Sequence, residues 1–321
     1  MKVPVEIITL LKKEEKFLIM THINPDGDAI GSSTALSLAL GSVGKETLLY
    51  DRDPVPQFYR FLPGYERFTN SISSLVTGHW SLILLDCNSP ERAGIDNLTF
   101  KHSIVIDHHE TERDFGDIRW MDTETAATGL MVFYLIKELG IKITRDIAIN
   151  LYSAISIDTG TFRYSNTTPE VLRVGAELIE AGANPYYISN SLYETWSGGR
   201  FDLLIRALNT LEIRDDIAIT TVTKEMFIKT RTGPEDTENF SNFPRMIQSV
   251  RISALFREID TGLWKVSLRS KGDVNVARIA ELFDGGGHKN AAGYKIKADL
   301  ESAKEALLKA VNGYCHKSQQ T

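Results

Sequence analysis

The sequence predicts an α/β fold, with a mostly parallel sheet flanked by helices and a smaller α/β domain after it. Short apolar runs alternate with helix-like segments over the first 185 residues, which is the pattern of a parallel sheet covered by helices. The pattern changes after residue 209, where strands predominate. A chain of 321 residues is also long for a single core, which favours two domains.

Four apolar runs in the first part are expected to be buried strands, at residues 17–20, 47–50, 81–85 and 104–106. Helices are expected at 29–40, closed by Gly41 and Gly44, and at 126–139 and 147–157. The apolar spacing at 147–157 is also compatible with a strand. A further helix is expected to start at Thr168-Pro169-Glu170 and to run to about Ala181.

The second part begins with a helical segment. Residues 186–209 are expected to link a first domain, 1–185, to a second domain, 210–321. The second domain is expected to have strands at 217–222, 252–256 and 264–268 and helices at 274–283 and 303–311. Two loops are also expected, a glycine-rich one at 284–288 and a polar surface loop at 230–242.

Composition excludes several classes of protein. The net charge is −6, whereas a protein that grips long nucleic acid by its backbone is usually basic; short nucleotides stay compatible with a locally basic pocket. Cys87 and Cys315 are too few and too far apart for a disulfide framework, which favours a reducing cytoplasm. The charged N-terminus is no signal peptide, and no apolar stretch of about 18 residues predicts a membrane span.

Acidic and histidine side chains follow several of the apolar runs. Ligands of open α/β sheets bind beyond the carboxyl ends of the strands, so these side chains are expected to converge at one edge. They are His22, Asp26, Asp28, Asp86, Asp107, His108, His109 and Asp158. Mixed imidazole and carboxylate ligands suit Mn²⁺, with Mg²⁺ or Co²⁺ as alternatives. Two such ions, roughly 3.5–4 Å apart, activate water for in-line displacement at phosphorus.

Each motif has a simpler structural interpretation when it is taken alone. Asp28 could cap the helix that follows it, and Asp86 and Asp158 could be turn residues. Gly285-Gly286-Gly287-His288 could be a bare turn, although consecutive backbone N–H groups also form anion sites. Cys87, beside Asp86, is interpreted as a small packed residue and not as a nucleophile.

In combination, the blocks resemble the motifs of the DHH phosphoesterase superfamily. The matching blocks are 22–32, Leu85-Asp86, 106–109 and Asp158-Thr159-Gly160, and 285–293 resembles the signature of the DHH-associated C-terminal domain. The chain length is similar to the stand-alone NrnA type, and not to the larger RecJ exonucleases. Family II pyrophosphatases share the first motifs but have a different C-terminal domain.

The resemblance implies a role for each residue. His22 and Asp26 would bind one metal, Asp28, His108 and Asp158 the other, and Asp86 would bridge them. His109 would be catalytic beside the scissile phosphate, with Asp107 behind it. The far end of the substrate would be held, in a cleft between the two domains, by Arg269, Ser270, Gly286, Gly287 and His288.

The resulting expectation is a cytoplasmic, Mn²⁺-dependent phosphoesterase with two ions. It would hydrolyse short oligoribonucleotides (nanoRNA) to mononucleotides and dephosphorylate 3′-phosphoadenosine 5′-phosphate (pAp) to AMP. Two alternatives stay open: a phosphodiesterase for linear dinucleotides such as pApA, and a non-catalytic nucleotide-binding sensor. No membrane partner is expected, and a homodimer is as compatible with the sequence as a monomer. Because the chain is acidic, extra phosphates of longer RNA are expected to add little affinity.

Overall fold

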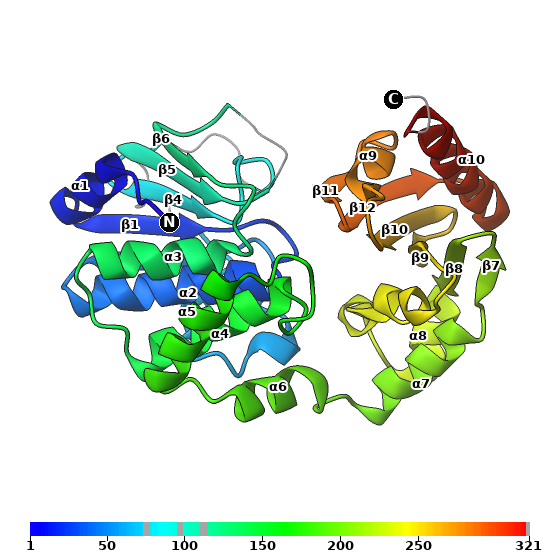
Figure 1. Cartoon of the computed structure of the whole chain (residues 1–321), viewed down its shortest axis with the longest axis horizontal. Coiled ribbons are helices and arrows are strands. Elements are labelled where there is room, and N and C mark those ends of the chain that lie inside the picture. The colour runs from blue at the N-terminus through cyan, green and yellow to red at the C-terminus, as the bar shows by residue number, and fades with distance from the viewer. Residues whose placement is uncertain (73–77, 95–98, 110–113, 319–321) are drawn as a thin grey trace. The chain divides into compact units, whose positions relative to one another are not determined.

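The computed structural model describes residues 1–72, 78–94, 99–109 and 114–318. The chain divides into two compact units, Met1–Thr195 and Trp196–Thr321, and each has its own sheet. Figure 1 shows the two units in one view. No helix in the described part of the chain is long and apolar enough to cross a membrane.

The first unit is built on a six-stranded sheet in which every neighbouring pair is parallel (Figure 1). Its order is β3-β2-β1-β4-β5-β6. The strands are β1 Lys16–Met20, β2 Glu46–Tyr50, β3 Phe68–Thr69, β4 Ser81–Leu85, β5 His102–Asp107 and β6 Ile118–Met121. The sequence-based prediction of a mostly parallel sheet is therefore confirmed.

In the described part of this unit there are six helices and two short 3₁₀ turns, η1 Gln57–Tyr59 and η2 Tyr65–Arg67. The helices are α1 Val5–Lys13, α2 Gly27–Ser42, α3 Thr128–Glu138, α4 Arg145–Asp158, α5 Pro169–Glu180 and α6 Pro185–Tyr193. Their apolar side chains pack with Phe17, Ile19 and Ile83 in one large core on one face of the sheet. On the other face Leu18, Met20 and Leu82 form a smaller cluster.

The predicted helix at 147–157 is confirmed as α4, and its strand alternative is wrong. The predicted end of the first helix is wrong, because α2 continues through Gly41 to Ser42. The chain leaves that helix at Gly44, whose φ of 86° suits glycine. Asp26, and not Asp28, caps this helix, since its carboxylate accepts hydrogen bonds from the N–H groups of Asp28 and Ala29.

The second unit has a mixed six-stranded sheet with the order β11-β12-β10-β9-β8-β7. Among the described strands of this second sheet, only the β8–β9 pair is parallel. The strands are β7 Glu212–Arg214, β8 Ile217–Val222, β9 Ile252–Asp260, β10 Leu263–Ser270, β11 Gly286–His288 and β12 Ala291–Lys297. The helical elements are α7 Gly198–Leu208, α8 Lys224–Thr230, η4 Pro234–Thr237, η5 Phe240–Asn242, η6 Pro244–Met246, α9 Val276–Glu281 and α10 Leu300–Ser318.

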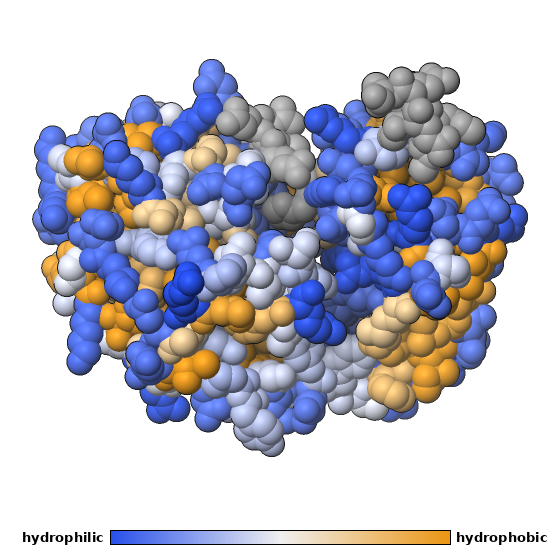
Figure 2. All heavy atoms as spheres, viewed as in Figure 1, coloured by the Kyte–Doolittle hydropathy of each residue, from blue (hydrophilic) through white to orange (hydrophobic). Residues whose placement is uncertain are grey.

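The two faces of this second sheet differ. One face packs against α9 and α10 through a core that includes Trp264, Val266 and Leu307. On the other face, α7 and η5 pack over Val222 and Leu255, and so cover the β8–β9 side. Of the predicted connector 186–209, α6 therefore lies in the first unit and α7 contributes to the core of the second. Hydrophobic side chains also gather on the surface over α7 and α8 (Figure 2), where Phe201, Ile205 and Ile228 are exposed.

Two predicted loops of the second domain are corrected by the structure. Residues 286–288 of the glycine-rich segment form an edge strand, β11, paired with β12. Glycine is needed there because a Cβ at Gly285 or Gly287 would collide with carbonyl oxygens of β12. The polar segment 230–242 is not simply a surface loop, since it forms η4 and η5 and inserts Phe240, 2% exposed, beneath α7.

Candidate metal centre

The predicted metal ligands meet at the carboxyl edge of the first sheet. His22 follows β1, Asp86 follows β4, and His108 follows β5. Asp28 lies in the first turn of α2, and Asp158 is the last residue of α4. Parallel strands end at the same edge, so residues far apart in sequence become neighbours there.

Asp86 lies at the middle of the cluster. Its Oδ2 is 3.4 Å from Nε2 of His22, and its Oδ1 is 3.4 Å from Nε2 of His108. The Thr128 hydroxyl donates a 3.0 Å hydrogen bond to Oδ1 and fixes the carboxylate. The backbone of Asp86 has φ of +56°, an uncommon value outside glycine. Such a conformation persists only where the surroundings hold it, as at functional sites.

The potential metal ligands form two groups around Asp86. Ligand atoms of His22, Asp26 and Asp86 lie within 4.8 Å of one another, and so do those of Asp28, His108 and Asp158. His108 Nε2 is 3.2 Å from Asp158 Oδ2 and 3.4 Å from Asp86 Oδ1, so Asp86 is near both groups. The structure thus brings all of the predicted metal ligands together.

Both histidines of these groups turn the same ring atom toward the acids. Nδ1 of His22 is 3.1 Å from the Ile23 carbonyl, and Nδ1 of His108 is 3.1 Å from the Thr125 carbonyl. A carbonyl can only accept a hydrogen bond, so Nδ1 is the donor in each ring. Nε2 is then the nitrogen whose lone pair is available to a metal. Backbone contacts therefore set the orientation of both rings.

Asp28 is held by the start of another helix. Its Oδ2 accepts a 2.6 Å hydrogen bond from the Thr128 N–H, and its Oδ1 accepts a 2.8 Å bond from the Gly129 N–H. These N–H groups begin α3, where the helix dipole favours negative charge. Asp28 thus accepts hydrogen bonds at the start of a helix, as its alternative interpretation implied, but this helix is α3, 100 residues away in sequence, and not α2.

His109 lies beside the two groups and is oriented by Asp107. Its Nδ1 is 2.6 Å from Asp107 Oδ1, and its backbone N–H donates to the same oxygen at 3.2 Å. Both residues are buried. The Nε2 atom of His109 faces the guanidinium of Arg92 at 3.5 Å. The pair therefore has the geometry of an imidazole fixed by a carboxylate on one nitrogen.

The electrostatics of the cluster fit bound cations. Burial, and then the charge of Asp86, raise the pKa of Asp26 to about 6, and they raise the pKa of Asp28 well above its usual value. Burial disfavours the charged form of His22, but its hydrogen bond to Asp86 and the charge of Asp26 outweigh this and raise its pKa to about 9. Carboxylates this crowded resist ionisation unless positive charge joins them. Oxygen and imidazole donors suit divalent cations, so the residues present fit a metal pair.

Arg92 is a residue of this site that the sequence analysis missed. Its carbonyl accepts a 2.8 Å hydrogen bond from the Ile23 N–H, which ties its loop to that of His22. Its Nη1 is buried without a hydrogen-bond partner among the described residues, and no acid of the described chain pairs with it. The sequence signal that could have identified Arg92 is its place six residues after Asp86, in the segment that follows the end of β4.

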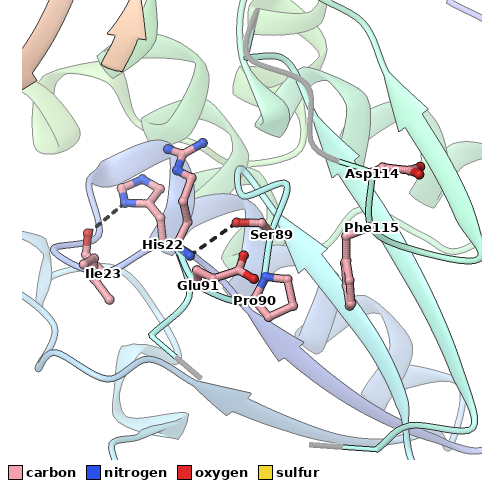
Figure 3. A pocket seen from close by; sticks show the side chains of 8 residues that line it. His22, Ile23, Ser89, Pro90, Glu91, Asp114 and Phe115 are labelled. Atoms are coloured by element: carbon pink, nitrogen blue, oxygen red, sulfur yellow. Dashed lines mark hydrogen bonds between the residues drawn. The ribbon is translucent and has the colours of Figure 1, made fainter. Parts of the chain in front are cut away.

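A pocket of about 630 Å³ adjoins the cluster at Arg92. Figure 3 shows its other lining residues, which come from three segments of the first unit. They are His22, Ile23, Ser89, Pro90, Glu91, Asp114 and Phe115. Cys87 lies nearby but is buried, and burial raises the pKa of its thiol to about 12, which fits a packed residue.

The predicted substrate residues lie in the second unit, on β10 and β11. Arg269 and His288 are both in register with Ala291, so the sheet brings them into one row across three strands. The side chain of His288 lies outside the described part of the structure. Gly286 has open space above its Cα, and Gly287 packs against β12. Ser270 is 1% exposed, and its hydroxyl donates to the Val274 carbonyl at 2.7 Å, which holds a turn together.

Known proteins share both halves of this chain. Residues 16–155 match the DHH family, N-terminal domain, and residues 217–317 match the DHHA1 domain. The chain is 38% identical over 300 residues to the bifunctional oligoribonuclease and PAP phosphatase NrnA of Thermus thermophilus, covering 93% of this chain and 90% of that protein. The chain belongs to the DHH family of phosphoesterases. The resemblance found in the sequence is thereby confirmed.

Two further comparisons extend along nearly the whole chain. The NrnA protein of Bacillus subtilis is 27% identical, with 92% of this chain and 97% of that protein covered. The crystal structure of an exopolyphosphatase-related protein from Bacteroides fragilis has a TM-score of 0.87 and 31% identity, and covers 97% of this chain and 95% of that one. The chain is therefore similar to both proteins along nearly its whole length.

Proposed function

We propose that this DHH protein hydrolyses short oligoribonucleotides to mononucleotides and dephosphorylates pAp to AMP, with two divalent cations and Mn²⁺ as the preferred ion. The central position of Asp86 carries the proposal, because its two oxygens face two different histidines. One carboxylate in that position can contact two ions. The names of the relatives in Thermus thermophilus and Bacillus subtilis support the choice of substrates.

In this proposal, His22 and Asp26 would hold one ion, Asp28, His108 and Asp158 would hold the other, and Asp86 would contribute to both. Divalent cations in such a site activate water for attack on phosphorus and neutralise charge on the phosphate. The chain's own contribution is to fix the donors, through Ile23 and Thr125 for the two rings and α3 for Asp28.

His109 would act on the reacting phosphate and not as a permanent metal ligand. With Nδ1 donating to Asp107, Nε2 can donate a proton to the leaving oxygen when the ring is in its imidazolium form, which the Asp107 carboxylate stabilises. Arg92, 3.5 Å from that atom, would add positive charge where negative charge develops in the transition state. Asp107 keeps the imidazole in the orientation that this role needs.

The test compares three substrates with one enzyme preparation. Purified protein is incubated with pAp, a diribonucleotide and pApA, with Mn²⁺, Mg²⁺ or Co²⁺ added after chelator treatment, and AMP and phosphate are quantified. We expect turnover of pAp and of the diribonucleotide with Mn²⁺, and none with chelator. Nucleotide binding without turnover under every metal condition would refute the proposal and favour the sensor. Turnover restricted to pApA would favour the dinucleotide phosphodiesterase.

A further inference from the structure

Three cations stand side by side on the second sheet. Lys265 on β10 is in register with Arg257 on β9 and with Lys295 on β12. Residues in register on neighbouring strands project from the same face of a sheet. The strand order β12-β10-β9 thus forms a row of three positive side chains, called here the cation row. Its two outer members, Arg257 and Lys295, lie 38 residues apart in the sequence.

The cation row lies on the face opposite α9 and α10. The alternate residues Trp264, Val266 and Phe256 belong to the core beneath those helices, so Lys265 and Arg257 point the other way. On their own face, α7 and η5 cover the β8–β9 side. Two positions along from Lys265 and Lys295, on the same face, the paired residues of β10 and β12 are Ser267 and Gly293. Both are small, so no bulky side chain stands beside the row on that side.

Within the described chain, no acid lies within 4.0 Å of any cation in this row, and none of the three makes a side-chain hydrogen bond. Lys265 and Arg257 are nonetheless half-buried. Burial lowers the pKa of Lys265, and the charges of Arg257 and Lys295 lower it further, with Glu238 acting in the opposite direction. Some other cations of this unit form salt bridges, such as Lys304 with Glu212.

Like charges directly opposite one another destabilise a sheet. A row of three without a salt bridge in the described chain therefore suits an added anion, and the acids whose charges favour the ionised form of Arg257 are Glu238 and Glu235. Multiple cations on one face, with small residues between, suit a chain of phosphates, because several phosphates can be neutralised together. Arg269 lies on the same face of β10, four residues from Lys265, or about 13 Å along the strand.

We propose that Arg257, Lys265 and Lys295 bind the phosphates of oligonucleotides that extend beyond a dinucleotide. This inference rests on the proposed function and deepens it by setting a preferred substrate length. If Arg269 holds one end of the substrate, the cation row lies about 13 Å away along β10. That distance is longer than the spacing of adjacent phosphates, so a mononucleotide or a dinucleotide does not reach the row. Affinity then increases as the oligonucleotide grows long enough to reach the row, and levels off afterwards. The acidic net charge of the whole chain suggested the opposite.

The experiment measures length dependence in the full-length protein. Wild type and a Lys265→Gln, Lys295→Gln double variant are assayed with 5′-labelled RNA of two to eight nucleotides, and the readout is the KM of the dinucleotide divided by that of each longer substrate. We expect this ratio to rise several-fold in wild type and to stay near one in the variant. Lys309→Gln, an exposed lysine of α10 on the other side of the sheet, is the matched control and should behave as wild type.

Salt dependence tests the ionic nature of the contact. The slope of log affinity against log salt for a labelled hexanucleotide, bound in the presence of chelator, should fall by about 0.7 for each cation that is removed. Lys265→Arg, Lys295→Arg keeps the charges and should keep the slope and the length dependence, which separates lost charge from damaged folding. An unchanged ratio and slope in the glutamine variant would overturn the proposal.

The two proposals fail in different ways. A wild-type enzyme that turns over neither pAp nor RNA refutes the proposed function, while hexanucleotide binding still tests the cation row. A wild-type enzyme that cleaves dinucleotides and longer RNA with equal KM refutes the row and leaves the proposed function intact.

Discussion

The two units concentrate opposite charges. At the edge of the first sheet, four carboxylates crowd around two histidines, and the pKa values of Asp26 and Asp28 are raised as a result. On the second sheet, three cations stand in register without acidic partners in the described chain. Both arrangements are unfavourable in isolation, and each suits a ligand of the opposite sign. The first fits divalent cations, and the second fits phosphates.

The difference lies in how tightly each site is held. At the edge of the first sheet, Asp86 and His109 each have a further contact that fixes them, from the Thr128 hydroxyl and the Asp107 carboxylate. The cation row has long side chains and no such supports. A site that fixes its donors suits chemistry, which needs precise geometry, whereas flexible cations suit affinity for a substrate of varied length.

The largest effect is expected for Asp86, the residue that tests whether one carboxylate serves both groups. Asp86→Ala should lower kcat by at least about 10³-fold, because both ion positions lose a donor. Turnover of pAp and metal content by mass spectrometry are the measurements. Asp146→Asn, an exposed acid at the start of α4, is the control and should keep full activity. A variant that retains more than about a tenth of wild-type turnover at saturating Mn²⁺ contradicts the bridging role.

The adjacent histidines should separate binding from catalysis. His109→Ala should lower kcat by about 10²–10⁴-fold and keep both ions, since a positioned acid or base contributes that much. His108→Ala should lose an ion, because His108 Nε2 faces Asp86 and Asp158. Metal-to-protein ratios and single-turnover rates of the two variants distinguish the roles. Loss of metal from the His109 variant alone would reverse them.

Arg92 tests whether a cation also contributes to the site in the first unit, where acidic groups predominate. Arg92→Ala should lower kcat/KM by about 10–100-fold, the range of one hydrogen bond to a charged group. Arg92→Lys should recover part of the loss, because it keeps the charge but not the fork of the guanidinium. Arg52→Ala, at an exposed arginine beyond the end of β2, removes a guanidinium elsewhere in the same unit and is the control. Equal kinetics in Arg92→Ala and Arg52→Ala would exclude a role at the phosphate.

The smallest effect is expected in the thermal stability of metal-free protein. Asp26 and His22 both have folded-state pKa values above their unfolded values of about 4 and 6.5, at about 6 and 9. Each therefore adds stability at low pH that is lost as pH rises through its folded-state pKa. We expect Tm in chelator to fall between pH 5 and 9, and Mn²⁺ to raise Tm more at pH 8 than at pH 5.5, because the ion replaces these protons. Asp26→Asn should weaken both trends, and a Tm gain independent of pH would contradict them.

Much of the first unit follows from local sequence signals. The runs 17–20, 81–85 and 104–106 are short and mostly apolar, and polar residues follow each one. Both the strands and the edge where His22, Asp86 and His108 meet could therefore be predicted. Helix α5 was predictable from its Thr168 cap and Pro169. The ends of α2 were not, because a glycine at position 41 is tolerated inside a helix when packing supports it.

The sequence by itself determined the family, the parallel sheet and the set of metal-binding candidates, because these depend on residue types and spacings within short segments. Only the tertiary structure decided the rest. Asp28 meets the start of α3 across 100 residues, Arg92 meets His109 through a loop, and Arg257, Lys265 and Lys295 meet through strand register. Register and loop packing depend on contacts between distant segments, and a net charge of −6 averages over them. The acidic composition of the chain therefore concealed a row of cations that the second sheet assembles.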